Sequence, residues 1–240
     1  MADQEFIETH FLNIQLNEHT LDTYIPRIAI LAAVKEYMML FEGSLLDVGC
    51  GQMPYRKMIT EANKKITSYM GLDLKSSSIH DTSVADLHWD GKTIPLENES
   101  VNCAMATEVL EHSFEPEQTL SEINRVMKKG GAFFFTVPFV WPLHEVPYDA
   151  YRYTPFSLRR HLESTNFSNI EIKSLGGWHT SFGQMLGLWV KESPLTGNKK
   201  KLAIYFAKKI IPWLLKNDQK ENTFKHHTMI SGLYGVATKK

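Results

Sequence analysis

The stretch Leu45-Leu46-Asp47-Val48-Gly49-Cys50-Gly51 decides the fold class of this sequence. Its apolar half predicts a short buried strand, and its two glycines predict a tight turn in which the backbone approaches a ligand closely. A second strand is predicted over residues 67–72 and ends at Asp73, 22 residues after Gly51. A glycine turn followed about 20 residues later by an acid is typical of nucleoside-binding sites, because a carboxylate accepts hydrogen bonds from both ribose hydroxyls.

The turn differs from the fingerprint of dinucleotide-binding enzymes, which would need a third glycine at position 54. The sequence has Pro54 there, which suits the first turn of a helix because its missing N–H would have no partner. We therefore expect a helix through about residue 64, and a nicotinamide-dependent dehydrogenase is disfavoured.

Strand and helix patterns alternate through the rest of the chain. Further strands are predicted over residues 83–85, 101–107, 132–137, 170–175 and 231–238. Helices are predicted over residues 27–41, 116–129 and 155–165. This alternation is typical of an α/β fold with a doubly wound, mostly parallel sheet and helices on both faces. Such folds bind ligands at the carboxyl ends of their strands.

Pattern and charge together divide the 240 residues into four segments. We expect an N-terminal helical segment over 1–42, a core over 43–178, a basic helical insertion or lid over 179–227, and the final strand of the core over 228–240. The net charge is −1, but residues 191–240 hold eleven lysines against three acids, so residues 1–190 carry about −9. No nucleic acid partner is expected, because most of the chain is acidic and contains no recognised binding module.

The composition also limits the compartment and the kind of site. Two separated cysteines, Cys50 and Cys103, are too few for a disulfide framework. Because His10, His19, His226 and His227 lack a ligand-like constellation as well, no metal site is predicted. The acidic start of the sequence lacks the features of a secretory signal. No uncharged apolar run approaches the roughly 20 residues of a membrane-spanning helix. These features predict a cytoplasmic protein.

Five motifs follow one another in a characteristic order. They are Leu-Asp-Val-Gly-Cys-Gly at 46–51, Asp73, Asp86-Leu87, Glu108-Val-Leu-Glu-His112 and Met127-Lys-Lys-Gly-Gly131. With these motifs the sequence resembles the class I S-adenosylmethionine-dependent methyltransferases, and among them the methyltransferase type 11 group. The resemblance implies a seven-stranded Rossmann-like sheet, S-adenosyl-L-methionine as cofactor and S-adenosyl-L-homocysteine as product. The sequence departs from the family at the usual third glycine of the turn, where it has Met53.

The resemblance also implies a set of cofactor-binding residues. Gly49 and Gly51 would pass beside the methionine moiety, and Asp73 would hold the ribose hydroxyls. Asp86 and Leu87 would flank the adenine. The complete expected set is Asp47, Gly49, Gly51, Gln52, Tyr55, Asp73, Leu74, Asp86, Leu87 and Glu108, of which the last lines the floor below the sulfonium.

The segment 138–155 is the candidate acceptor site, because it leaves the carboxyl end of the fifth predicted strand and is rich in charged and aromatic residues. His144 is predicted as the general base for a hydroxyl acceptor, and Asp149 as the second catalytic residue. The predicted substrate-binding residues are His112, Tyr148, Arg152 and Tyr153. The alternative is a rigid structural loop in which Asp149 and Arg152 pair and the aromatic residues pack, with His112 capping or packing.

Residues 199–216 predict an amphipathic helix within the insertion. Its apolar face would hold Leu202, Phe206, Ile210 and Trp213, and its basic face Lys201, Lys208, Lys209 and Lys216. Such a helix is typical of proteins that lie on an anionic bilayer, and it predicts peripheral contact at the inner face of the membrane. The alternative is a lid helix that packs its apolar side on the core.

These features favour methyl transfer to a small-molecule, sugar or glycolipid acceptor, at oxygen. Two alternatives stay open. One is methylation of a quinone-like or other lipid acceptor, and the other is a non-catalytic regulatory protein that binds S-adenosylmethionine.

Overall fold

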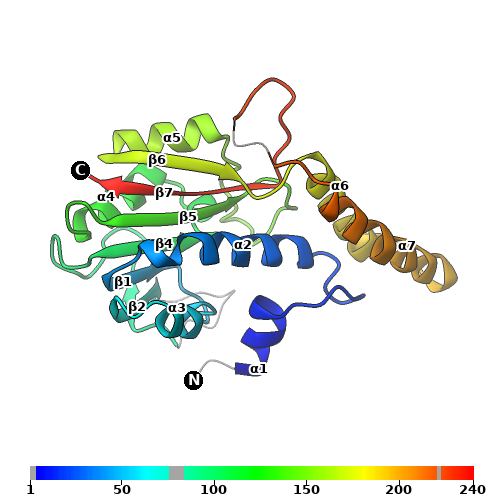
Figure 1. Cartoon of the computed structure of the whole chain (residues 1–240), viewed down its shortest axis with the longest axis horizontal. Helices are drawn as coiled ribbons and strands as arrows, with labels where there is room; N and C mark the ends of the chain where they lie inside the picture. Colours follow the sequence, from blue (N-terminus) through cyan, green and yellow to red (C-terminus); the bar gives the residue numbers. More distant parts are fainter. Residues whose placement is uncertain (1–3, 76–83, 221–222) are drawn as a thin grey trace.

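A computed structural model describes residues 4–75, 84–220 and 223–240 of the chain. Its centre is a sheet in the order β3-β2-β1-β4-β5-β7-β6 (Figure 1). β7 runs antiparallel to both of its neighbours, and the other paired strands run parallel. The strands are β1 Gly43–Val48, β2 Ile66–Leu74, β3 Leu87–Trp89, β4 Cys103–Thr107, β5 Ala132–Pro138, β6 Phe167–Ser174 and β7 Gly232–Lys239. The expectation of a mostly parallel, seven-stranded sheet is confirmed.

Helices cover both faces of this sheet, as predicted. They are α1 Gln4–Ile7, η1 Glu8–Leu12, α2 Tyr24–Tyr37, η2 Met38–Leu40, α3 Arg56–Ala62, η3 Leu110–His112, α4 Pro116–Val126, α5 Pro155–Ser164, α6 Trp178–Glu192 and α7 Gly197–Lys216. The interior strand β5 shows why both faces must be covered. Phe133 and Phe135 pack in the cluster that includes α4 and α5, whereas Phe134 packs in the cluster that includes α2 and α3. All three rings are fully buried, which is typical of an interior parallel strand.

Several predicted boundaries differ from the structure by a few residues, and two of these differences have an identifiable cause. The third strand was expected over 83–85, but residues 84–86 form a turn and a bend, β3 begins at Leu87, and position 83 lies outside the described residues. The Asp86 carboxylate, which accepts the Gly71 N–H at 2.8 Å, holds this approach to the strand. The helix predicted to reach residue 129 ends at Val126, because Met127 is extended and bridges to Val101.

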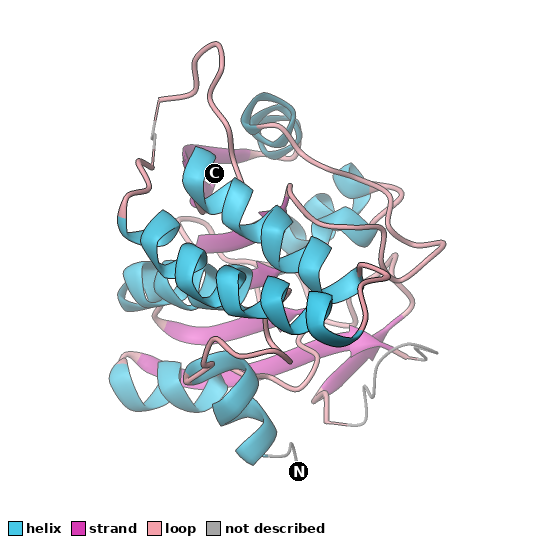
Figure 2. Ribbon diagram, turned by 90° about the vertical axis from the view of Figure 1, so that its right-hand side faces the viewer, coloured by secondary structure: helices cyan, strands magenta, loops and turns pink. Residues whose placement is uncertain are grey.

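α6 and α7 form the insertion before the last strand, and the chain folds them into a helical pair. Figure 1 shows the pair projecting from the end of the sheet where β5 finishes, and in Figure 2 the two long helices lie side by side in the foreground. α6 approaches the N-terminal segment closely at Gly187, where a Cβ would lie 2.0 Å from the carbonyl oxygen of Leu21. Among the described residues, no helix combines the length and apolar character needed to cross a membrane.

The face on which α7 packs differs from the face expected of a lid. Ala207, Ile211 and Leu214 are buried and face α6 and the N-terminal segment. The predicted apolar face is instead open to solvent: Leu202, Phe206 and Trp213 are 57%, 51% and 58% exposed. The alternative of a lid that packs this face on the core was therefore wrong.

Candidate functional site: the carboxyl edge of the sheet

The turn after β1 has the backbone shape that its glycines predict. Gly49 and Gly51 have φ of +65° and +49°, a region that residues with a Cβ rarely adopt. Within the described part of the chain, no heavy atom lies within 4 Å of the place where a Cβ of Gly51 would be, so a ligand can approach the backbone there. Met53, at the position of the usual third glycine, also has a positive φ of +51°. Its side chain packs against Gly71, and the turn keeps its shape without the glycine.

Asp73 lies directly beside this turn. Its Oδ2 accepts the backbone N–H of Gly51 at 2.8 Å, and its Oδ1 accepts the N–H of Leu74 at 2.8 Å. The contact arises because β1 and β2 are parallel neighbours, with Asp47 paired to Gly71, so both strands end at the same edge. The glycine turn and the acid are thus brought together as the sequence predicted.

Asp47 is buried beneath the turn, with 2% of its surface exposed. Its Oδ2 accepts the Tyr69 hydroxyl at 2.5 Å, whereas its buried Oδ1 has no hydrogen-bond partner among the described residues. Burial raises the pKa of the Asp47 carboxyl to about 7, and the Tyr69 hydrogen bond only partly opposes this shift. The orphaned oxygen can accept a hydrogen bond from a ligand donor that reaches the turn.

Glu108 follows β4 and has a positive φ of +56°. The Thr136 hydroxyl donates to its Oε1 at 2.8 Å, which fixes the side chain at the end of β5. Burial raises the pKa of Glu108 to about 7, against the Thr136 hydrogen bond and the charges of Arg27 and Arg152. Glu108 also lines a small pocket with Gln184 of α6 and with Trp141. Trp141 belongs to the segment between β5 and α5, which we call the acceptor loop. Sequence reasoning missed Arg27 and Gln184, because nothing in their local pattern marks them.

The other predicted cofactor residues lie around the same edge with differing exposure. Gln52 and Leu87 are half-buried, and Leu74 is exposed. Tyr55 is buried, and its ring packs edge-on against Phe11 of the N-terminal segment. Asp86 has a structural contact that the sequence did not reveal, since besides its bond to Gly71 it pairs with Arg56 at 3.2 Å.

The acceptor loop between β5 and α5 is held by an ion pair. Arg152 donates to Asp149 Oδ1 at 2.5 Å and to Oδ2 at 2.8 Å. The Arg152 charge and the backbone N–H of His144 hold the pKa of the Asp149 carboxyl at about 2, against the effect of burial. The ion pair between Asp149 and Arg152, which the alternative of a rigid structural loop predicted, is therefore present. Through the Asp149 carboxylate it also holds the backbone of His144. The catalytic roles of His144 and Asp149 remain predictions.

The predicted substrate-binding tyrosines separate into one accessible and one buried residue. Tyr148 is exposed. Tyr153 is 2% exposed, and its hydroxyl donates to the Leu110 carbonyl at 2.9 Å. The ring and hydroxyl of Tyr153 pack the loop onto η3, and its predicted contact with substrate stays a prediction.

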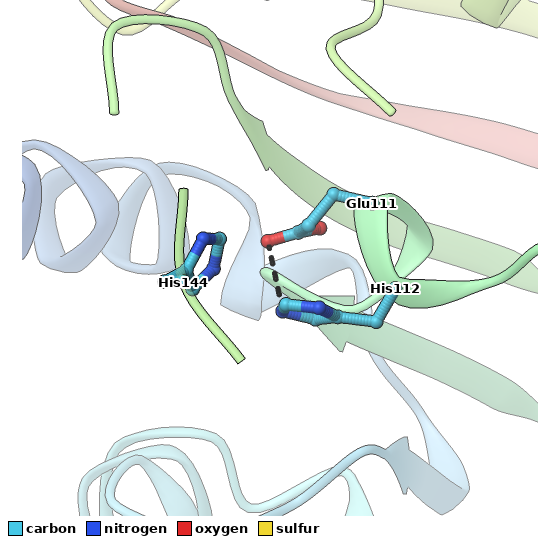
Figure 3. A group of neighbouring side chains, drawn as sticks. All are labelled: Glu111, His112 and His144. Atoms are coloured by element: carbon cyan, nitrogen blue, oxygen red, sulfur yellow. Dashed lines mark ion pairs between the residues drawn. The ribbon is translucent and has the colours of Figure 1, made fainter. Parts of the chain in front are cut away.

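Glu111, His112 and His144 converge in one place (Figure 3). Each offers a ligand atom, and these atoms all lie within 4.8 Å of one another. The His112 and His144 rings contact edge to face with centroids 4.7 Å apart. Glu111 was missed as a site residue, although it lies between Glu108 and His112 in a motif that the sequence analysis singled out.

The core of the chain matches a known family. Residues 46–135, from β1 into β5, match the sequence model of the methyltransferase domain. The matched segment, 90 of the 240 residues, is similar to a methyltransferase domain. The sequence resemblance is thereby confirmed.

One curated relative of the methyltransferase domain is an uncharacterized 37.1 kDa protein from a transposon of Streptomyces fradiae. It is 25% identical over 136 residues, which are 48% of this chain and 38% of that protein. The match therefore spans well under half of the relative's length.

Solved structures share the fold of the methyltransferase domain and its flanking helices. A possible histamine N-methyltransferase from Thermotoga maritima has a TM-score of 0.56 at 15% identity, covering 93% of this chain and 98% of that one. A methyltransferase from Archaeoglobus fulgidus scores 0.55 at 15% identity, covering 92% and 99%. Phosphoethanolamine N-methyltransferase 2 of Haemonchus contortus, in complex with S-adenosyl-L-methionine, scores 0.53 at 14% identity, covering 98% and 59%. At these identities the likeness shows the fold alone.

Proposed function

We propose that the protein transfers a methyl group from S-adenosylmethionine to a hydroxyl group of a lipid-linked acceptor such as a glycolipid. The observation that carries this proposal is the position of Asp73. Its carboxylate lies at 2.8 Å from the Gly51 N–H within a methyltransferase domain, at the edge where the acceptor loop also begins. The S-adenosylmethionine complex of the Haemonchus contortus enzyme, which shares the fold, supports the choice of methyl donor.

The residues at this edge fit that donor. The open space at Gly51 admits a chain against the backbone, and the orphaned Asp47 Oδ1 suits a donor such as an amino group. Asp73 has two carboxylate oxygens, each of which can accept a further hydrogen bond from a ribose hydroxyl. When bound, S-adenosylmethionine supplies a methyl group on a positively charged sulfur.

The protein contributes mainly by position, because methyl transfer is an in-line displacement that needs little covalent chemistry from side chains. Asp73 and the glycine turn fix the donor, and Glu108 lines a small pocket with Trp141 of the acceptor loop. The acceptor oxygen forms the new bond to the methyl carbon. The carbon–sulfur bond breaks with its electron pair on sulfur, and the hydroxyl proton is taken up on the side of His144.

The α6–α7 pair favours an acceptor held in a membrane. Large apolar side chains are exposed along both helices: Trp178, Phe182, Met185, Trp189, Leu202, Tyr205, Phe206, Ile210 and Trp213. On α6 the first four of these recur at helical spacing and form one stripe. So much exposed apolar surface is a feature of interaction sites. Exposed lysines on α7, including Lys208 and Lys209, match it to an anionic lipid bilayer.

The pair is also connected to the reaction site. Gln184 of α6 lines the same small pocket as Glu108 and Trp141, so α6 reaches the acceptor side of the sheet edge. A lipid-linked acceptor could then enter without leaving the bilayer surface. Quinone-like lipids fit this route as well, and they form the second candidate class.

The experiment measures S-adenosylhomocysteine release. The purified chain is incubated with S-adenosylmethionine and anionic vesicles that contain a glycolipid, a quinol or neither. Glycolipid-dependent release supports the proposal, and quinol-dependent release supports the second class. A protein that binds S-adenosylmethionine and releases no product with lipid extracts or soluble sugars would be a binding protein, and the proposal would be wrong.

A further inference from the structure

Glu111 is a buried carboxylate without a hydrogen bond. Its side chain is fully buried, and neither carboxylate oxygen has a hydrogen-bond partner in the described residues. Leaving such a group unsatisfied costs several kcal/mol, so buried carboxylates are ordinarily hydrogen-bonded, paired or bound to a metal ion. The backbone carbonyl oxygen of Glu111 accepts the N–H groups of Ala150 and Tyr151, which ties η3 to the acceptor loop.

Two imidazoles face this carboxylate. His112 Nε2 lies 3.8 Å from Glu111 Oε1, and His144 approaches from the acceptor loop (Figure 3). His112 Nδ1 lies 3.3 Å from the carbonyl oxygen of Tyr148. Since a carbonyl only accepts, this contact places the proton on Nδ1 and leaves the Nε2 lone pair directed toward Glu111.

We propose that Glu111, His112 and His144 bind a divalent transition-metal ion. Two imidazoles and one carboxylate are a donor set typical of Zn²⁺ and Fe²⁺ sites, and Mn²⁺ is compatible with it. Donor atoms about 2.1 Å from one ion lie roughly 3.4 Å from one another in a tetrahedral site. The candidate ligand atoms all lie within 4.8 Å of one another, so they are close enough to converge on one ion.

The surroundings resemble the outer shell of a metal site. Ligand histidines commonly direct their second nitrogen at a carbonyl or carboxylate, which fixes the ring orientation. His112 has the Tyr148 carbonyl in that place. His144 Nδ1 lies 3.2 Å from Asp149 Oδ2, within ion-pair distance but without hydrogen-bond geometry. Asp149 is itself fixed by Arg152. Glu145 Oε2, 3.7 Å from His112 Nε2, lies at the rim of the cluster.

This inference rests on the proposed function for its chemical meaning. Three protein ligands leave positions open for a hydroxyl, and a bound metal ion lowers the pKa of a hydroxyl that it holds. The acceptor hydroxyl then loses its proton to water, and its oxygen forms the bond to the methyl carbon as described above. In this form His144 acts as a ligand, and no side chain has to serve as base.

The test is calorimetric titration of chelator-treated, full-length protein with Zn²⁺ and with Mn²⁺, without S-adenosylmethionine. We expect one ion per chain, bound in the micromolar range or tighter, and at least a tenfold loss of affinity in His112→Ala and His144→Ala. The matched control is His161→Ala, because His161 pairs with Glu117 outside the cluster. Thermal melting of each variant without metal verifies the fold, and only the two ligand variants should lose the stabilisation that the ion gives the wild type.

No binding by the wild type, or equal binding by His144→Ala and the control, would overturn the inference and leave a metal-free cluster with a protonated Glu111. The outcome is independent of the proposed function. Methyl transfer that persists after chelation would refute a role of the metal ion in the reaction and leave the proposed function intact. Metal binding without any methyl transfer would refute the proposed function and leave the metal site intact.

Discussion

The guanidinium of Arg152 binds both carboxylate oxygens of Asp149, at 2.5 and 2.8 Å, and Asp149 in turn accepts the backbone N–H of His144 at 3.2 Å. This relationship fixes Asp149 beside the backbone of His144, and the predicted catalytic role of Asp149 stays a prediction. A buried carboxylate whose two oxygens are fixed by a guanidinium has little capacity to take up a proton, and the low pKa of about 2 agrees with that. The His144 side chain is 25% exposed, whereas that of Asp149 is 2% exposed.

His144→Ala should therefore lower turnover by about 10²-fold, within the usual range for a proton-transfer or hydroxyl-activating group. The affinity for S-adenosylmethionine should change less than twofold, because the Asp73 side of the site is untouched. Steady-state kinetics together with calorimetry measures both, with His161→Ala as the control. An unchanged turnover number would make His144 a structural residue.

Asp149→Ala should destabilise the fold by roughly 3 kcal/mol, because it leaves the partly buried Arg152 guanidinium without its partner. Urea denaturation of the variant and the wild type gives the difference. Arg159→Ala serves as a control, since Arg159 is exposed on α5 and bonds only the Ile170 carbonyl in the described contacts. A loss below about 0.5 kcal/mol would mean that the ion pair does not hold the loop.

Asp47 should make stability depend on pH. Its pKa is about 7 in the folded state and about 3.9 when unfolded, so between these values the folded protein binds the additional proton. Its contribution to stability is therefore present below about pH 4 and is lost as pH rises toward 7. Asp47→Asn removes this dependence. The free energy of unfolding of the variant minus that of the wild type should therefore rise by roughly 2–3 kcal/mol from pH 5 to pH 8.

Urea denaturation at the two pH values measures that change, without cofactor. A relative stability that stays the same at pH 5 and pH 8 would contradict the burial argument, because it would mean that Asp47 ionises normally in the folded protein.

The α6–α7 pair should bind anionic vesicles and not neutral ones. Lys208→Glu with Lys209→Glu should weaken co-sedimentation at least tenfold, since each lysine contributes about 1 kcal/mol near an anionic surface. Added salt should weaken wild-type binding as it screens the charges. Lys128→Glu with Lys129→Glu is the matched control, because these exposed neighbours precede β5 at the opposite edge of the sheet. Equal losses in both double variants, or no binding by the wild type, would contradict a membrane surface on α7.

The sequence predicted the fold well, because its signals are local. The apolar run of Phe133–Phe135 specifies a strand buried on both faces, and the positive φ of Gly49 and Gly51 follows from glycine itself. The predicted end of α4 was wrong because the bridge between Met127 and Val101 is a tertiary contact, which overrides local helix preference.

The site was only partly predictable for the same reason. Asp73 follows from a fixed spacing after Gly51. Burial of Tyr153 and convergence of Glu111 with His144, 33 residues later in the sequence, depend on how η3 and the acceptor loop pack together. The exposed apolar face of α7 was also out of reach, since a hydrophobic stripe in a sequence does not reveal whether the fold covers it.

The most direct test of the account is calorimetric titration of the wild type and Asp73→Asn with S-adenosylmethionine. Asparagine keeps an oxygen for the Gly51 N–H, so the turn should survive while the charge-assisted bonds to the ribose are lost. We expect binding by the wild type and an affinity about 10- to 100-fold weaker in the variant, or roughly 1.5–3 kcal/mol. No binding by the wild type, or equal affinity in the variant, would contradict the assignment of this edge as the methyl-donor site.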